Sequence, residues 1–230
     1  MGKDVIIACD FPSAEKMFSF LKPFEGRNPY LKIGMELYYA EGAPLVRELK
    51  KRGFRIFLDL KLHDIPNTVA SAMKVLSSLG VDIINVHAAG GRKMMAAAKE
   101  AVSGAEKPPV LIGVTQLTST SEEMLHSELL IERSMEDTVI SYAKNAKAAG
   151  LGGVVCSPLE AEIIHKVCGA DFLTVTPGIR FAENDKGDQT RVTIPAMAKQ
   201  LGSDYIVVGR SITGAENSLA AYERCVKDFC

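Results

Sequence analysis

Short apolar runs alternate with longer amphipathic or alanine-rich stretches along the whole chain. The short runs are rich in Val, Ile and Leu and are bounded by polar, Gly or Pro residues, which is typical of buried β-strands. The longer stretches repeat apolar residues with the spacing of a helix that buries one face. The predicted strands are Val5–Cys9, Leu31–Met35, Arg55–Leu60, Ile83–His87, Val110–Thr115, Gly153–Cys156, Phe172–Val175 and Tyr205–Val208. The predicted helices include Ala43–Lys51, Val69–Leu79, Met94–Val102, Glu136–Ala149, Leu159–Val167, Ile194–Leu201 and Ala215–Lys227.

This alternation predicts a parallel sheet built from βαβ units, because two parallel strands need a crossover connection, usually a helix. Eight such units in 230 residues indicate one (β/α)₈ TIM barrel domain over residues 1–230, a fold that usually takes about 250 residues. A doubly wound open sheet is the alternative fold. No G-x-G-x-x-G motif follows the first predicted strand, which disfavours the dinucleotide-binding version of that alternative.

The stretch FLDLKLHDIPNT, residues 57–68, interrupts the apolar pattern with charged residues. Asp59 and Lys61 are two residues apart, so on a strand their side chains leave the same face. Asp64 follows in the predicted loop, and Pro66 lies where a new helix would begin. One interpretation is an ion pair at a strand end, with Asp64 as a helix N-cap. The other is a functional charge array, which the position of Asp59 and Lys61 inside an apolar strand favours.

Polar residues also lie at the ends of most other predicted strands. In a parallel barrel the carboxyl ends of all strands meet at one rim, where active sites are built from the βα loops. One polar residue at a strand end is common in any fold, but many at the same rim indicate a functional site. The residues concerned are Asp10, Lys32, Asp59, Lys61, His87, Thr115–Thr118, Thr176–Arg180 and Gly209–Ser211.

The loops after the last two predicted strands favour an anion site, because barrels often bind phosphate there. Arg180 lies in the first loop, and Gly209 and Arg210 lie in the second. Glycine lets the backbone approach an anion, and a guanidinium offers a planar fork of donors. The alternative is an ordinary turn with two surface arginines. The long polar segment 177–191 is either a disordered insertion or a lid that closes on a ligand through Arg180 and Gln189.

Composition excludes several classes of partner. The 27 basic and 28 acidic residues give a net charge of −1, which predicts no general affinity for nucleic acid or for an anionic membrane surface. No apolar run approaches the roughly 18 residues of a membrane span, and the amino-terminal apolar run is too short for a signal peptide. The 5 cysteines show no C-x-x-C spacing, which is typical of reduced thiols. We therefore expect a cytoplasmic protein.

Motifs for metal binding and for nucleophilic catalysis are weak. His63 and His87 lack a recognised ligand spacing, so we expect hydrogen-bonding residues rather than metal ligands, and no further role is assigned to His87. Neither a G-x-S-x-G elbow nor a convincing Cys–His pair is present. The sequence predicts no metal site.

The motif D-x-K-x-x-D-I-P-x-T, residues 59–68, resembles the signature of the orotidine 5′-monophosphate decarboxylase family. The resemblance covers the whole chain and is greatest to the short, single-domain bacterial members. The chain is too short for the fused form, so no phosphoribosyltransferase domain is expected. The other matching positions are Asp10, Lys32, Gln116-Leu117-Thr118, Thr176-Pro177-Gly178-Ile179-Arg180, Asp188-Gln189 and Val208-Gly209-Arg210.

The resemblance implies decarboxylation of a small-molecule nucleotide, orotidine 5′-monophosphate (OMP), to uridine 5′-monophosphate (UMP) in pyrimidine biosynthesis, without a cofactor. It implies that Lys61 protonates C6 of the pyrimidine, within an alternating charge array that Lys32, Asp59 and Asp64 complete. It also implies a homodimer in which Asp64 and Thr68 reach into the partner's site. The remaining substrate-binding residues that it implies are Asp10 with Lys32 at the ribose, Thr118 at the pyrimidine, Arg180, Gln189, Gly209 and Arg210 at the phosphate, and Ile65 and Pro177.

Two alternative functions remain open. A sugar-phosphate decarboxylase or aldolase of the same superfamily resembles this chain in the D-x-K-x-x-D segment, but uses Mg²⁺ and has an acidic residue where this chain has Lys32. The alternative that is not an enzyme is a non-catalytic nucleotide-binding barrel. That alternative requires a broken charge array, whereas all four members are present in this sequence.

Overall fold

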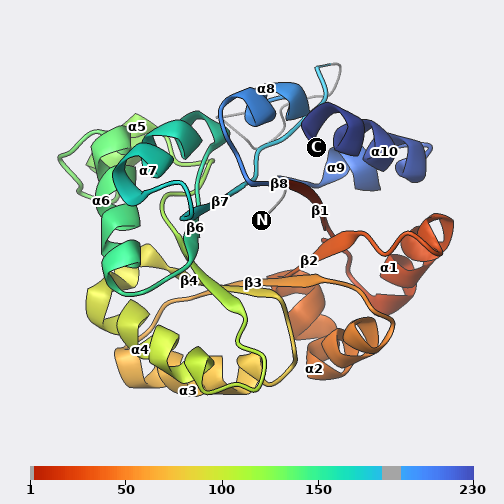
Figure 1. The fold of residues 1–230 in the computed structure, drawn as a ribbon, viewed down its shortest axis with the longest axis horizontal. Coiled ribbons are helices and arrows are strands. Elements are labelled where there is room, and N and C mark those ends of the chain that lie inside the picture. The colour runs from red at the N-terminus through yellow and green to blue at the C-terminus, as the bar shows by residue number, and fades with distance from the viewer. Residues whose placement is uncertain (1–2, 183–192) are drawn as a thin grey trace.

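Eight parallel strands form a closed barrel in the computed structural model, which describes residues 3–182 and 193–230. The strands pair in sequence order, and β8 pairs with β1 to close the ring (Figure 1). The predicted TIM barrel is therefore confirmed, and the open sheet is excluded. The strands are β1 (Asp4–Ala8), β2 (Tyr30–Gly34), β3 (Ile56–Leu62), β4 (Ile83–His87), β5 (Val110–Val114), β6 (Gly153–Val155), β7 (Leu173–Thr176) and β8 (Tyr205–Val208).

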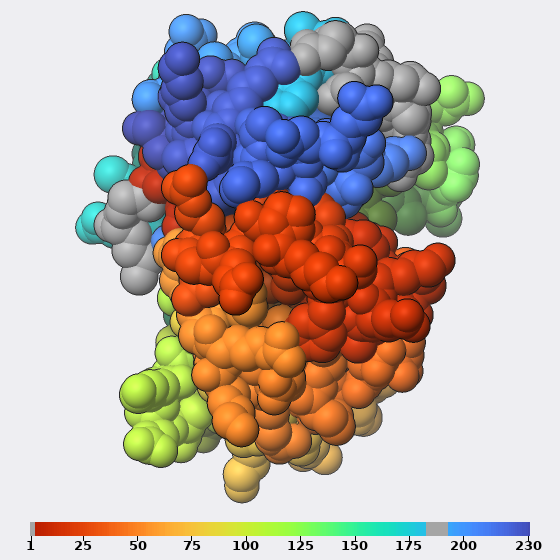
Figure 2. All heavy atoms as spheres, turned by 90° about the vertical axis from the view of Figure 1, so that its right-hand side faces the viewer, coloured from red at the N-terminus to blue at the C-terminus, as the bar shows by residue number. Residues whose placement is uncertain are grey.

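Helices cover the outside of the ring (Figure 1). Figure 2 shows the face where the first part of the chain, in red, meets the last part, in blue, with α2 in orange on the other side of the red part. The α-helices of the described residues are α1 (Ala14–Leu21), α2 (Met35–Lys51), α3 (Pro66–Ser77), α4 (Gly91–Ser103), α5 (Glu122–Ser127), α6 (Met135–Ala148), α7 (Ala161–Cys168), α8 (Pro195–Gln200), α9 (Arg210–Thr213) and α10 (Ser218–Phe229). The described residues also form three short 3₁₀ helices, η1 (Lys22–Phe24), η2 (Ala88–Gly90) and η3 (Pro158–Glu160).

The second helix is longer than predicted. The prediction began at Ala43, whereas α2 begins at Met35. Gly42 interrupts α2 with φ 68° and ψ −162°, a conformation that glycine adopts without the steric penalty of a side chain, and Pro44 follows it. The predicted segment therefore corresponds to the part of α2 after the break.

Strand residues alternate between two apolar layers. In β1, Ile6 packs inside the barrel, whereas Val5 and Ile7 pack outward against the helices. In β3, Phe57 occupies the interior layer and is 1% exposed, which stabilises the fold by about 1.5–3 kcal/mol. Asp59 is the next residue of β3 on that interior face. The strand pattern thus directs a charge into the carboxyl end of the barrel.

Two expectations from composition can be compared with the fold. All five cysteines are thiols, and burial raises the pKa of Cys9 to about 12, which keeps that thiol protonated and unreactive. Among residues 3–182 and 193–230, no helix is both long enough and apolar enough to span a bilayer.

Candidate active site

A pocket of about 200 Å³ opens at the carboxyl end of the barrel. Its floor consists of interior-layer residues, and its wall carries the charged end of β3 together with Lys32 of β2. An apolar floor with a few convergent polar groups is the usual composition of a small-molecule site. The lining residues are Lys32, Phe57, Asp59, Lys61, Val114, Gln116, Leu117, Thr118, Ser119, Val155, Cys156, Pro177 and Val207.

Four charged side chains of alternating sign follow one another at this pocket: Lys32, Asp59 and Lys61 line it, and Asp10 lies beside Lys32. Lys32 Nζ lies 2.8 Å from Asp10 Oδ1 and 3.5 Å from Asp59 Oδ2. Lys61 Nζ lies 2.8 Å from Asp59 Oδ1. The structure therefore brings together Asp10, which follows β1, Lys32 of β2, and Asp59 and Lys61 of β3, as expected from their positions at strand ends.

Mutual attraction keeps the two most buried members ionised. Lys32 and Asp59 are each 8% exposed. Desolvation acts to raise the pKa of Asp59, but Lys32 and Lys61 outweigh it, and the pKa lies below its ordinary value. Desolvation acts to lower the pKa of Lys32, but Asp59 and Asp10 outweigh it, and the pKa lies above its ordinary value. The pocket wall therefore holds fixed charges at neutral pH.

The geometry at Lys61 is not that of a regular strand. Between the pairs Leu58–Ile84 and Leu62–Val86, β3 advances by four residues while β4 advances by two, which is a β-bulge. Lys61 lies in this bulge with φ 51°, a left-handed conformation that is rare for residues other than glycine. Asp59 and Lys61 lie close together, as predicted. The direction of the Lys61 side chain is set by the bulge and not by the alternation of a regular strand.

Sequence reasoning missed Gly34, which ends β2 beside the array. A Cβ atom at this position would lie 2.9 Å from Asp10 Oδ1 and 3.0 Å from Lys32 Nζ. The absence of a side chain at Gly34 therefore makes room for the Asp10–Lys32 pair. No sequence motif marks this glycine, because the requirement arises from two side chains on neighbouring strands.

Asp64, Ile65 and Thr68 are exposed and lie outside the lining of the pocket in their own subunit. The predicted helix start is confirmed, because α3 begins at Pro66. The N-cap interpretation of Asp64 is wrong: Ile65 is the N-cap residue, without a side-chain cap bond. The Asp64 carboxylate instead accepts a hydrogen bond from the Ile65 N–H at 2.6 Å.

The proposed anion-binding residues lie at the rim rather than in the pocket lining. Arg180 donates to its neighbouring carbonyl, Ile179 O, at 2.9 Å. Arg210 lines a separate hollow of about 330 Å³ at α9 and α10. Gly209 precedes α9 as its N-cap residue. Gln189 lies outside the described residues.

The long segment after β7 has a defined stem. The Arg180 N–H donates to Thr193 O at 3.0 Å, and the Thr193 N–H donates to Gly178 O at 3.0 Å. These two bonds form an isolated parallel bridge at Ile179 and Thr193. The stem therefore brings Ile179 and Thr193 together after β7, and residues 183–191 of the predicted lid lie outside the described residues.

His63 and His87 stack beside the end of β4, with ring centroids 5.7 Å apart and planes inclined by 16°. The Ala89 N–H donates to His87 Nδ1 at 3.2 Å. Burial lowers the pKa of His87, and the charges of His63 and Lys61 lower it further. In the described part of the chain, no group of three or more His, Cys, Asp or Glu side chains is arranged to hold a metal ion.

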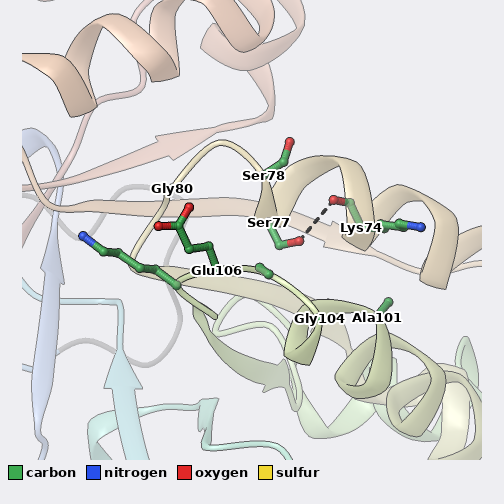
Figure 3. A pocket seen from close by; sticks show the side chains of 9 residues that line it. Lys74, Ser77, Ser78, Gly80, Ala101, Gly104 and Glu106 are labelled. Atoms are coloured by element: carbon green, nitrogen blue, oxygen red, sulfur yellow. Dashed lines mark hydrogen bonds between the residues drawn. The ribbon is translucent and has the colours of Figure 1, made fainter.

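A larger hollow of about 510 Å³ lies between the carboxyl-terminal ends of α3 and α4 (Figure 3). Small residues line most of it, together with Lys74, Glu106 and Lys107. The Ser77 hydroxyl in its wall donates to Lys74 O at 3.1 Å. This hollow precedes β4 and β5 in the chain, so it lies at the opposite end of the barrel from the charge array. We therefore assign the chemistry to the smaller pocket.

Comparison with known proteins connects this chain to one family. The model of the orotidine 5′-phosphate decarboxylase / HUMPS family matches residues 3–225. A Geobacillus sp. (strain WCH70) protein named orotidine 5′-phosphate decarboxylase is 56% identical over 234 aligned positions, covering 100% of this chain and 98% of the relative. A Bacillus cereus (strain AH820) protein of the same name is 55% identical, covering 97% of this chain and 95% of the relative.

Solved structures agree with this result. The crystal structure of orotidine 5′-phosphate decarboxylase from Lactobacillus acidophilus matches with a TM-score of 0.88 and 42% identity, covering 99% of each chain. An uncharacterized conserved protein from Geobacillus kaustophilus matches with a TM-score of 0.86 and 50% identity, covering 98% of this chain and 100% of that one.

Proposed function

The chain belongs to the orotidine 5′-phosphate decarboxylase / HUMPS family, and we propose that Lys61 is the proton donor in its reaction, the decarboxylation of OMP to UMP. The relatives' names, at 55–56% identity over nearly the full chain, make it a carboxy-lyase of pyrimidine biosynthesis. The observation that carries the assignment of Lys61 is its ammonium at the pocket wall, 2.8 Å from a buried, ionised Asp59.

The chemistry requires a cation at that place. Loss of carbon dioxide from C6 leaves an electron pair in the plane of the pyrimidine ring, where the π system of the ring cannot delocalise it. A preplaced ammonium stabilises this charge as it develops, and the same group can deliver the proton that completes the product. Lys61 meets both requirements. Repulsion between Asp59 and the substrate carboxylate is a second, smaller contribution.

The other implied residues bind the substrate around this centre. Asp10 and Lys32 hold the ribose hydroxyls. Their mutual hydrogen bond at 2.8 Å supports this assignment, because it fixes both side chains. Thr118 hydrogen-bonds the pyrimidine and Pro177 contacts the substrate, assignments that their place in the pocket lining supports. The phosphate is held by Arg180, Gln189, Arg210 and the Gly209 backbone after β7 and β8.

The proposal includes a homodimer with shared sites. Ile65 is 66% exposed beside exposed Asp64 and Thr68. A large apolar side chain between two polar ones is suited to a subunit interface. In the dimer, Asp64 completes the partner's charge array, and Ile65 and Thr68 contact the partner's substrate. We further propose that the chain acts as one domain in the cytoplasm, binding neither nucleic acid nor membranes, and that it needs no metal or other cofactor.

An absorbance assay tests this function. Purified protein is mixed with OMP in the presence of EDTA, and the loss of OMP absorbance and the formation of UMP are followed. We expect full turnover that EDTA does not change. Turnover that requires added Mg²⁺ would favour the sugar-phosphate class of enzyme. Binding of UMP without any turnover of OMP would favour the non-catalytic barrel.

A further inference from the structure

Asn85 is a fully buried polar residue in the middle of β4. Its exposed fraction is 0%, and its neighbours Ile84 and Val86 belong to the apolar core. A buried amide costs about 1–3 kcal/mol when its hydrogen bonds are not made. Both polar atoms of Asn85 are in fact used, and both bonds go to the charged end of β3.

The first bond supports the backbone of the bulge. A bulge takes residues out of the strand ladder, so the Lys61 N–H has no regular partner on β4. Asn85 Oδ1 accepts this N–H at 2.8 Å, in place of a strand carbonyl. Lys61 holds a left-handed conformation with φ 51°, which costs about 1–2 kcal/mol for a residue with a side chain. The Asn85 bond stabilises Lys61 in that conformation.

The second bond orients the carboxylate. Asn85 Nδ2 donates to Asp59 Oδ1 at 2.7 Å, and the same oxygen accepts from Lys61 Nζ at 2.8 Å. The other oxygen, Oδ2, then faces Lys32 Nζ at 3.5 Å. The orientation of the amide is determined by its partners, because a backbone N–H only donates and an ionised carboxylate only accepts.

We infer that Asn85 is a positioning residue, whose amide sets the backbone of Lys61 and the carboxylate of Asp59 so that the ammonium faces the substrate pocket. Asn85 is not among the residues that line the pocket, so it acts through Lys61 and Asp59 rather than on reacting atoms. The inference rests on the proposed role of Lys61 and adds a residue that the sequence motif does not contain.

Asn85→Asp and Asn85→Leu test this role. An ionised carboxylate can still accept from the Lys61 N–H, but it cannot donate to Asp59, and it repels that carboxylate. The repulsion and burial raise the pKa of the introduced carboxyl. Once protonated, its carbonyl oxygen accepts and its hydroxyl donates, which restores the native pattern. Leucine has the same number and branching of side-chain heavy atoms and can do neither.

The measurement is kcat and KM for OMP between pH 5 and 9, with circular dichroism to establish folding. We expect kcat of Asn85→Asp to be about a hundredfold below wild type at pH 8, the effect of a misplaced catalytic group, and to recover as the pH falls. Asn85→Leu should lose kcat to a similar extent at every pH, with KM changed less than kcat. Asn145→Asp on α6, the same chemical change away from the barrel interior, is the control and should follow the wild-type profile.

Wild-type kcat and pH profile in both folded Asn85 variants would overturn the inference. Equal losses in both, without recovery of Asn85→Asp at low pH, would reduce Asn85 to a packing role and overturn it as well. If Asn85→Leu does not fold, the pH profile of Asn85→Asp decides alone. Failure of the proposed function appears elsewhere, as absent OMP turnover in the wild type or undiminished turnover in Lys61→Ala.

Discussion

Lys61 Nζ lies 2.8 Å from Asp59 Oδ1, although the strand ladder is interrupted between Leu58 and Leu62. A regular strand would place the two side chains on one face, and the bulge additionally turns the Lys61 backbone to φ 51°. The ion pair is therefore fixed by backbone geometry as well as by attraction. That rigidity matters for catalysis, because a preplaced charge needs no reorganisation when the transition state forms.

The phosphate group should promote the chemical step as well as binding. Arg180 lies at the stem of the segment after β7, away from the pocket lining. Remote binding energy can be used to close and desolvate a site, so orotidine without its phosphate should lose kcat as well as affinity. Arg180→Ala should lower kcat/KM for OMP about tenfold to a hundredfold, the effect of one charged hydrogen bond of about 1.5–3 kcal/mol.

Steady-state kinetics check this prediction, with Arg52→Ala as the control. Arg52 follows α2 at the opposite end of the barrel and pairs with Glu48, so its removal should leave turnover unchanged. If orotidine reacts with full kcat and only a raised KM, the segment is a binding clamp and does not assist the chemistry.

The shared site can be tested by subunit mixing. Homodimers of Lys61→Ala and of Asp64→Ala should both be strongly impaired, since every site lacks one charged group. In a mixed dimer, one site loses both groups and the other keeps both, because a two-fold interface is reciprocal. Mixing the two variants under subunit exchange should restore up to one working site per mixed dimer. Sizing checks that neither variant blocks dimerisation; if mixed dimers form in good yield and stay inactive, Asp64 acts within its own chain.

The charge array should influence stability with a defined sign. The pKa of Asp59 lies below its ordinary value, so its ionised form stabilises the fold above the ordinary value of about 3.9. This contribution is lost as the pH falls through the lower native pKa. The pKa of Lys32 is raised, so its contribution is present below about 10.4 and is lost as the pH rises through the native pKa.

Urea unfolding of wild type and Asp59→Asn between pH 3 and 8 measures the first of these effects. The difference in free energy of unfolding between the two proteins should stay constant from about pH 5 upward, and the wild type should lose stability relative to the variant below that. A difference that does not change with pH in the acid range would show that Asp59 has an ordinary pKa.

Gly34→Ala should disturb the array without unfolding the barrel. The added methyl would lie 2.9 Å from Asp10 Oδ1 and 3.0 Å from Lys32 Nζ, so both side chains must move. We expect kcat/KM to fall about tenfold, since small displacements of positioning groups are costly to catalysis. Gly104→Ala is the matched control, because its nearest neighbour would be Ala101 O at 3.8 Å. Equal activity in the two variants would contradict the packing argument.

The pattern of apolar runs predicted all eight strands of the described chain, and Ile83–His87 and Tyr205–Val208 with the observed bounds. Strands in a closed barrel are buried on both faces, which makes them easy to recognise. The short helices α1 and α5 were missed, because few of their residues are buried and their starts depend on local capping. Ser13 and Ser121, for example, cap α1 and α5 with their side chains. Helix α9 was missed because its 4 residues are too few to show a helical repeat.

The sequence predicted the site only in part, because it shows which residues are unusual in a strand but not which strands are neighbours. Lys32, Asp59 and Lys61 stand out as charges in apolar strands, so their positions alone indicated a cluster. Asn85 and Gly34 did not, because their importance depends on which strands are neighbours and on a bulge that shifts the register. A lone Asn in the apolar run IINVH was the available signal for Asn85. Such contributions are visible only once the strands are paired in space.

Turnover of OMP by Lys61→Ala, compared with Lys74→Ala, tests the central claim most directly. Lys74 is exposed on α3 at the hollow away from the charge array, so its variant controls for the loss of a lysine. Lys61→Ala should turn over OMP about 10⁴-fold more slowly or worse, since a general acid contributes about 10²–10⁴ and a preplaced charge about 10²–10³. Binding of UMP, measured by calorimetry, should remain detectable. Near-normal turnover in Lys61→Ala would contradict the role of Lys61 as the proton donor.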